Sequence, residues 1–215
     1  MSSTCNEGIR RPPNDVLLRD QTMFTGKNVL LGISGSVAAI RTPVLVRLLQ
    51  RSGATVQVIV TNRAASFIET ESTMPEKAKL LRDEDEWSTW GKISDPVLHI
   101  ELRKWADIFL VAPLSANTLA KLAHGLCDNL LTCVARAWPF GTSDEKERKP
   151  FFVAPAMNTS MWNHPVTITQ LEIIRSFGVC VIEPISKKLA CGDTGQGAME
   201  EPEQIVSFMA KRLSV

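Results

Sequence analysis

The stretch NVLLGISGSVAAIRTPVLVRLLQRSGATVQVIVT (residues 28–61) contains a complete strand–helix–strand unit. Its two ends, 28–34 and 55–61, are short runs rich in apolar residues with little polar alternation, which is typical of strands covered on both faces, as in a parallel sheet. Between them, Ser36–Arg51 places apolar residues at three- and four-residue intervals and stops at Ser52-Gly53. This spacing predicts an amphipathic helix with a C-terminal glycine stop.

The same alternation continues along the chain, so we expect an α/β fold with an open parallel sheet and helices on both faces. Further strands are expected at 108–113, 151–155 and 179–184, and further helices at 116–138, about 165–177 and about 202–213. A length of 215 residues suits one domain. We expect that domain to span 27–215, after a flexible tail at 1–26, with a charged, solvated loop at 142–149.

Composition excludes several classes of partner. Lys plus Arg number 24 against 23 Asp plus Glu, so no strong field favours nucleic acid or an anionic membrane. No stretch reaches the roughly 18 apolar residues of a membrane span, and the N-terminus lacks a signal-peptide core. The five cysteines contain no C-x-x-C pair, which argues against a disulfide framework or a metal site. A reducing, cytosolic setting is expected.

Small and polar residues follow the first and third predicted strands. Open parallel sheets bind ligands at the carboxyl ends of their strands, and Gly35 and Ser36 would let backbone N–H groups approach a phosphate there. Neither G-x-G-x-x-G nor a P-loop is present, so a mononucleotide such as FMN remains open. Ser115, Asn117 and Thr118 offer further polar groups. The plain alternatives are an ordinary turn and an N-cap.

Two later segments also carry candidate chemistry. APAMNTSMWNHP (154–165) holds Asn158, whose amide could bind a carboxylate, and Met161, which could equally be a core residue. LACGDTGQGAMEEP (189–202) places Cys191 among three glycines. Because glycine destabilises both helix and strand, we expect a flexible loop that folds over a site. Cys191 is then a functional candidate, although most cysteines are buried hydrophobes.

His99 is the best candidate for a general base among the three histidines. Histidine ordinarily titrates near neutral pH, which suits proton transfer. It lies in DPVLHIELRKWAD (95–107), between apolar neighbours, and a structural histidine is the alternative. His124 precedes Gly125 and His164 precedes Pro165, so both suit helix ends or turns.

Several segments together resemble the homo-oligomeric flavin-containing cysteine decarboxylase family, in particular its eukaryotic phosphopantothenoylcysteine decarboxylases. The segments are SGSVAAI (34–40), DEDEWSTW (83–90), DPVLHIELRKWAD (95–107), APLSANTLAKLAHGLCDNLLTC (112–133), APAMNTSMWNHP (154–165) and ACGDTGQGAMEEP (190–202). The resemblance spans nearly all of residues 28–210. It implies a flavodoxin-like Rossmann fold and a homotrimer whose active sites lie between subunits.

The resemblance also implies a cofactor, a substrate and residue roles. FMN would be held by Gly35, Ser36, Val37, Thr61, Ser115, Ala116, Asn117, Thr118 and Ala156. His99 would be the base and Cys191 the final proton donor. Asn158 would hold the substrate carboxylate and Met161 would shape the pocket, with Lys188 and Ala190 along the phosphopantothenoyl arm. The reaction would convert 4′-phospho-N-pantothenoyl-L-cysteine to 4′-phosphopantetheine, in coenzyme A biosynthesis, through a thioaldehyde and an enethiolate.

One residue departs from the family pattern, and other functions are possible for such a fold. Lys104 stands where an Arg is expected in the family, which affects subunit packing rather than chemistry. A non-catalytic regulatory subunit that binds a protein phosphatase is the main alternative, but the long acidic tails of such proteins have no counterpart before Val215. An oxidative peptidyl-cysteine decarboxylase and a flavin prenyltransferase are disfavoured by Cys191 in its glycine segment and by the histidine and PAMN segments.

Overall fold

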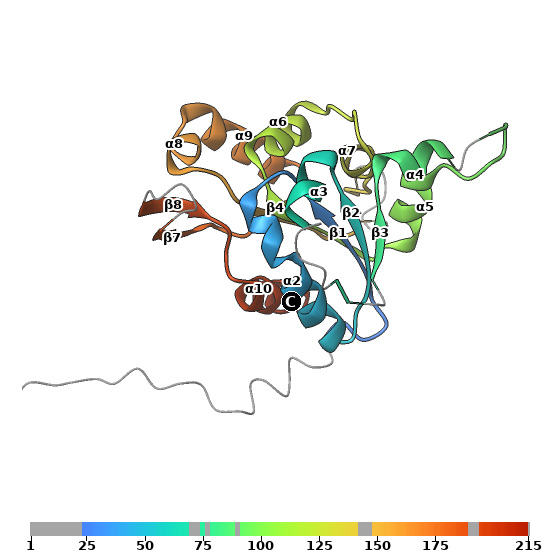
Figure 1. The fold of residues 1–215 in the computed structure, drawn as a ribbon, viewed down its shortest axis with the longest axis horizontal. Coiled ribbons are helices and arrows are strands. Elements are labelled where there is room, and N and C mark those ends of the chain that lie inside the picture. The colour runs from blue at the N-terminus through green and yellow to red at the C-terminus, as the bar shows by residue number, and fades with distance from the viewer. Residues whose placement is uncertain are drawn as a thin grey trace, which may run out of the picture.

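The computed structural model describes residues 23–68, 74–75, 78–88, 91–141, 148–188 and 194–214. A six-stranded sheet forms its centre, and all strand pairs in it are parallel (Figure 1). The strands are β1 (Asn28–Ile33), β2 (Thr55–Val60), β3 (Lys79–Leu81), β4 (Ile108–Leu114), β5 (Phe151–Pro155) and β6 (Cys180–Val181). Their order is β3-β2-β1-β4-β5-β6. Without the short edge strand β3, this is the order of flavodoxin-like folds, and the expected fold class is confirmed.

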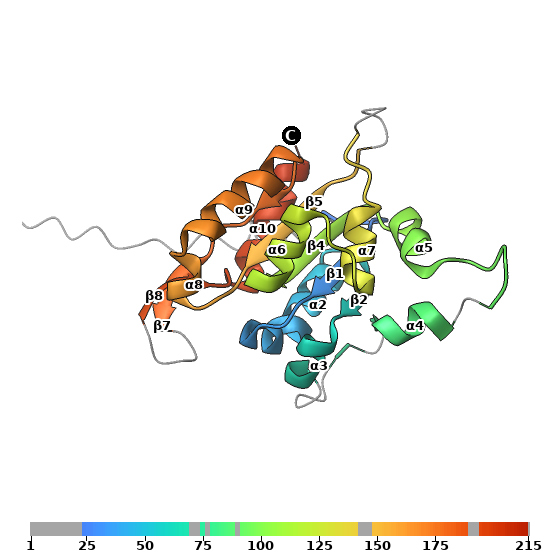
Figure 2. The ribbon, with the colours of Figure 1, turned by 90° about the horizontal axis from the view of Figure 1, so that it is seen from above.

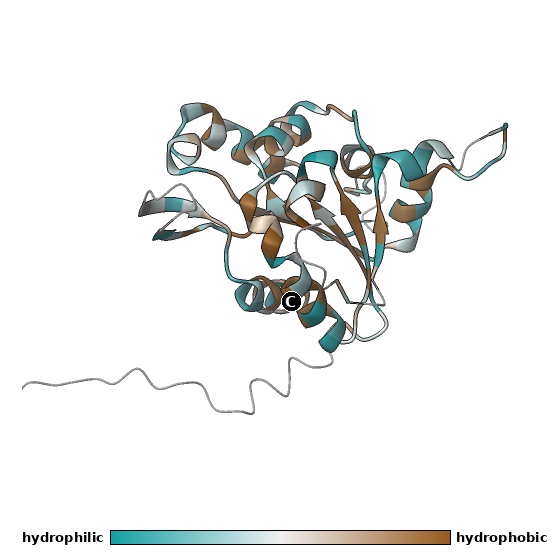
Figure 3. Cartoon of the chain, in the orientation of Figure 1, coloured by the Kyte–Doolittle hydropathy of each residue, from teal (hydrophilic) through white to brown (hydrophobic). Residues whose placement is uncertain are grey.

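Helices cover both faces of the sheet, as Figures 1 and 2 show. One face carries η2 (Val37–Arg41), α2 (Thr42–Arg51), α3 (Asn62–Ile68) and α10 (Pro202–Leu213). The other carries α5 (Leu98–Trp105), α6 (Ala116–His124), α7 (Leu130–Arg136) and α9 (Pro165–Ser176). Successive strand residues alternate between the two apolar layers: Leu31 packs into the first and Leu30 into the second. The apolar strands therefore run through the middle of the molecule (Figure 3).

The single helix expected at 116–138 is two helices. Gly125 adopts a left-handed conformation with φ 71° and ends α6, because a residue without Cβ takes that conformation at little cost. Asn129 then starts α7 with a capping box to Thr132. The break matters for function, since the connecting loop brings Asp128 and Asn129 to the carboxyl end of the sheet.

The glycine segment at 189–202 is only partly the loop that we expected. Thr194–Ala198 forms strand β8, which pairs antiparallel with β7 (Ile185–Lys188). A Cβ at Gly197 would lie 2.5 Å from the Met157 carbonyl oxygen. The Met157 N–H donates to the Gly197 oxygen at 2.9 Å. The glycines thus allow close approach to the 154–165 segment, where α8 (Thr159–Trp162) lies beside β8.

Two segments that we expected to be mobile are partly packed. Residues 1–22 and 142–147 lie outside the described residues. Phe24, inside the expected tail, is 1% exposed in the core, and its N–H donates to the Ser52 carbonyl at 2.9 Å. Lys149, at the end of the charged run, donates to the carbonyls of Arg103, Lys104 and Ala106 at the end of α5. In the part of the chain described, no helix is long and apolar enough to span a membrane.

Candidate functional site

A cavity of about 530 Å³ lies at the carboxyl ends of β1, β2, β4 and β5. This volume falls within the range of about 300–1,000 Å³ typical of small-molecule sites. All the residues expected to hold a cofactor line it: Gly35, Ser36, Val37, Thr61, Ser115, Ala116, Asn117, Thr118 and Ala156. The cavity sits where the chain reverses its direction of strand addition, between β1 and β4, the usual ligand position in such sheets.

Ser34 ties two of these strand ends together. Its Oγ donates to the Pro113 carbonyl at 2.8 Å and accepts from the Ser115 N–H at 2.7 Å. Its side chain is fully buried. Thr61 makes a similar but local link, donating to the Ile33 carbonyl at 3.2 Å. The sequence suggested only that Ser34 ends a strand, because its bridging role depends on β1 and β4 being neighbours.

The cavity wall formed by the turn at Gly35 and Ser36, after β1, is suited to binding an anion. A Cβ at Gly35 would lie 2.8 Å from the Arg63 Cβ, so the glycine lets α3 approach the turn. Arg63 is exposed, lines the cavity and forms no ion pair with the described residues. Ser36 caps η2 and Ser115 caps α6, where backbone N–H groups begin each helix. These groups fit the phosphate of a mononucleotide. Arg63 was not among the expected site residues, although its place shortly after the strand 55–60 was an available signal.

The opposite wall of the cavity is acidic. Lys121 donates to both carboxylate oxygens of Asp128 at 2.7 Å, which lowers the pKa of Asp128. Burial raises the pKa of Asp83, and repulsion from Glu84, Glu86 and Asp128 adds to the rise. The Asp83 carboxylate accepts a hydrogen bond from the Leu130 N–H at 2.8 Å, and this bond opposes the rise in the pKa of Asp83. Asp83 therefore links α4 (Asp83–Ser88) to the start of α7 beside the cavity.

Asn158 and Met161 reach the cavity from the segment after β5. The Asn158 Oδ1 accepts from the Ser160 N–H at 2.8 Å as the cap of α8. The Nδ2 group is then the part of this amide that can donate to a carboxylate. Met161 is 49% exposed, so it is not the core residue that composition alone suggested. Ala190 and Cys191 lie outside the described residues, and Lys188 belongs to β7.

A second cavity of about 440 Å³ adjoins the first. The two share Ser36, Val37, Ala156, Met157 and Asn158. Its far wall is formed by the β7–β8 hairpin and the residues that follow it. There Glu201 accepts a hydrogen bond from Lys187 at 2.9 Å and forms an ion pair with Arg41 at 3.0 Å. The hydrogen bond from Lys187 lowers the pKa of Glu201. An elongated ligand could therefore extend from Asn158 along the hairpin.

His99 does not line either cavity. It lies in α5, where its Nδ1 is hydrogen-bonded to the Glu86 Oε1 of α4. Figures 1 and 2 both place α5 and α8 at opposite ends of the molecule. Within one chain, the expected base is therefore separated from Asn158 and Met161.

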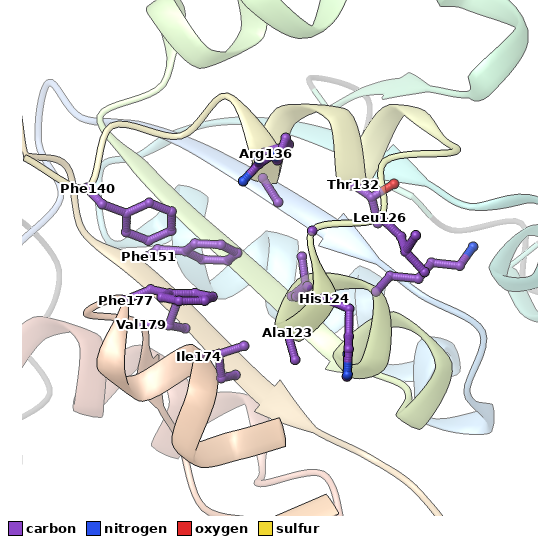
Figure 4. A pocket seen from close by; sticks show the side chains of 14 residues that line it. Ala123, His124, Leu126, Thr132, Arg136, Phe140, Phe151, Ile174, Phe177 and Val179 are labelled. Carbon is purple, nitrogen blue, oxygen red and sulfur yellow. The ribbon is translucent and has the colours of Figure 1, made fainter. Parts of the chain in front are cut away.

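A third cavity of about 330 Å³ lies between α6, α7 and α9 (Figure 4). The rings of Phe140, Phe151 and Phe177 stand along one side, and Arg136 and Leu126 lie on the other. Of the expected site residues that the structure describes, none is in its lining. Lys121 lines both this cavity and the one at the strand ends.

Comparison with known proteins agrees with this geometry. The model of the family described as Flavoprotein matches residues 17–214. The chain belongs to the flavoprotein family. A phosphopantothenoylcysteine decarboxylase of Oryza sativa subsp. japonica is 56% identical over 179 residues, covering 83% of this chain and 77% of the relative.

Solved structures of other flavoproteins share the fold at high identity. One is a cysteine-to-serine mutant of PPC decarboxylase complexed with pantothenoylaminoethenethiol. It has a TM-score of 0.82 and 50% identity, covering 88% of this chain and 99% of that chain. The FMN binding protein AtHal3 has a TM-score of 0.77 and 52% identity, and the match covers 87% of this chain and 95% of that chain. The similarity to these solved structures thus covers nearly nine-tenths of this chain.

Proposed function

We propose that this chain is an FMN-dependent decarboxylase that converts 4′-phospho-N-pantothenoyl-L-cysteine to 4′-phosphopantetheine, a step of coenzyme A biosynthesis. The observation that carries the proposal is the single cavity in which the expected cofactor residues meet Asn158 and Met161. The polar turn at Gly35, with Arg63 beside it, fits the FMN phosphate. High identity to phosphopantothenoylcysteine decarboxylases supports the substrate.

Each residue has a specific task in this reaction. The residues of the first cavity would hold FMN, whose chemistry would be reversible hydride acceptance, so that the substrate cysteine could reach the thiocarbonyl level that accepts the electron pair left by CO2. Asn158 holds the substrate carboxylate through Nδ2, Met161 shapes the adjoining wall, and His99 takes a proton at Nε2. Cys191 returns a proton to the product carbon. Lys188 and Ala190 flank the phosphopantothenoyl arm.

The active site is completed by a second copy of the chain in a homotrimer. The support for this is the separation of His99 from the cavities within one chain. General bases act within hydrogen-bond reach of the proton that they remove. A neighbouring subunit that places its α5 over the cavity would supply the base.

The first experiment tests cofactor and reaction together. The purified chain should be yellow, hold one FMN per chain, and release CO2 from phosphopantothenoylcysteine with phosphopantetheine as the product by mass spectrometry. His99→Asn should keep the flavin and the fold but lose activity by about 10²–10⁴-fold, the usual worth of a general base. A colourless protein that does not bind added FMN would overturn the proposal.

The second experiment tests the shared site by mixing two inactive variants. His99→Asn lacks the base and Asn158→Ala lacks the carboxylate holder. In trimers co-assembled at equal ratio, roughly a quarter of the interfaces combine an intact base with an intact holder. Co-expression should therefore restore roughly a quarter of the wild-type activity. Activity no higher than that of either parent variant would place both residues in one chain's site and refute the sharing.

A further inference from the structure

We infer that Glu86 is the positioning residue for His99 and fixes Nε2 as the atom that accepts the proton. The inference rests on the proposed function, in which His99 is the base. Glu86 lies in α4 and His99 in α5, and the two helices are in contact. In the sequence, Glu86 stands in the DEDEWSTW segment, which contributes to the family resemblance but suggests no role for this residue.

The hydrogen bond between the two side chains determines the tautomer. Glu86 Oε1 contacts His99 Nδ1. An ionised carboxylate only accepts, so Nδ1 must carry the shared hydrogen, and the lone pair of the neutral ring is then at Nε2. The Glu86 side chain is 10% exposed and that of His99 is 25% exposed. The carboxylate is thus held inside the protein while the ring it orients remains accessible to a partner.

Cys133 completes a cluster with Glu86 and His99 that could in principle hold a metal ion. The geometry favours a hydrogen-bonded pair instead. Zinc bonds of about 2.0–2.2 Å in a tetrahedral site would hold the nitrogen and oxygen about 3.3 Å apart, whereas these atoms are in direct contact. Burial raises the pKa of the Cys133 thiol to about 11, and the thiol donates to the Cys127 carbonyl. Cys133 is therefore a neutral neighbour of the pair.

Other charged groups stand on the same two helices as the pair. Asp83 and Glu84 stand on the same helix as Glu86, and the rise in the pKa of Asp83 includes repulsion from Glu86. On α5, Glu101 pairs with Lys104 at 2.8 Å.

The test compares Glu86→Gln with Glu101→Gln in the FMN-bound enzyme. Both variants remove one carboxylate, and Glu101 lies on the helix of His99 without bonding to it. Glu86→Gln should lower kcat by about 10- to 100-fold, the usual loss when a partner that orients a functional histidine is removed. KM, FMN content and melting temperature should change little. Glu101→Gln should retain the wild-type kcat.

A tautomer measurement separates orientation from a structural role. Only three histidines are present, so ¹⁵N spectra of the imidazoles can be assigned with His99→Asn. Wild-type His99 should be protonated at Nδ1 when neutral, and Glu86→Gln should shift it toward a mixture of tautomers. If Glu86→Gln does not fold, Glu86→Asp, which keeps the charge but shortens its reach, should show the same loss in kcat.

The outcomes distinguish this inference from the proposed function. A wild-type protein that releases no CO2 overturns the proposed function, and the ¹⁵N spectra then still decide whether Glu86 fixes the tautomer. An active wild type with an inactive His99→Asn and a fully active Glu86→Gln overturns the role of Glu86 alone. A lower melting temperature with unchanged kcat and tautomer would make Glu86 structural and refute the inference.

Discussion

Ser34→Ala should destabilise the chain far more than the loss of one hydroxyl suggests. The Pro113 carbonyl keeps a partner, because the Ser34 N–H also donates to it at 3.2 Å. The buried Ser115 N–H loses its partner. A lost hydrogen bond costs about 0.5–1.5 kcal/mol and an orphaned buried donor about 1–3 kcal/mol, so the expected loss is about 2–4 kcal/mol.

Thr61→Val is the matched control, since it also removes one hydroxyl bond at a strand end. The Ile33 carbonyl still accepts from the Thr61 N–H at 3.1 Å, so no buried group is orphaned. Its cost should stay at about 0.5–1.5 kcal/mol. Urea unfolding of the FMN-free variants, all at the same protein concentration, measures the loss in unfolding free energy for each substitution. Equal losses for the two variants would refute the reasoning that Ser34 satisfies a buried donor.

Three further predictions concern the site and its surroundings. Cys191→Ser should still release CO2 but make a product two hydrogens lighter than phosphopantetheine by mass spectrometry, because a hydroxyl is a poorer proton donor than a thiol; normal product at the wild-type rate would exclude Cys191 as the donor. Asp83→Asn should stabilise the protein at neutral pH. Because the pKa of Asp83 is raised in the folded state, the stability that its protonated carboxyl contributes is present below pH 3.8, the ordinary pKa, and is lost as pH rises through the folded-state pKa. The stability gained by Asp83→Asn should therefore vanish in melting curves below pH 3.8. Cys133, with a pKa of about 11, should react with iodoacetamide at pH 8 about 200-fold more slowly than an unperturbed thiol of pKa about 8.5, in proportion to the thiolate fraction; similar rates by peptide mass mapping would contradict its burial.

The sequence was sufficient to predict the sheet because both faces of its strands are buried. Runs such as 55–61 and 151–155 are rich in apolar residues, and the structure places them in parallel strands between two helical layers. Shorter strands carried no such signal. The edge strand β3 has three residues, two of them exposed. Strand β8 contains two glycines, whose role appears only when Met157 and Thr159 are seen against them.

The cofactor wall of the site was also predictable, since parallel strands end at a common edge. The residues after β1, β2, β4 and β5 line one cavity. Most of them could be predicted by treating each segment that follows a strand as a candidate part of the site. Contacts between segments far apart in sequence were not predictable in this way. Ser34 with Ser115, and Glu86 with His99, are pairs whose members look ordinary until the fold brings them together.

The position of His99 connects these observations. A histidine between apolar residues, held by a buried carboxylate, satisfies the structural interpretation as fully as the catalytic one. The cavity toward the other end of the molecule favours the catalytic interpretation over the structural one. It contains Asn158 and the expected cofactor residues but no histidine in its lining. A reaction that begins with removal of a proton needs a base at that cavity. Under the proposed function, the same side chain would serve the fold of its own subunit through Nδ1 and the chemistry of the next subunit through Nε2, and Glu86 would keep these two tasks on separate nitrogens.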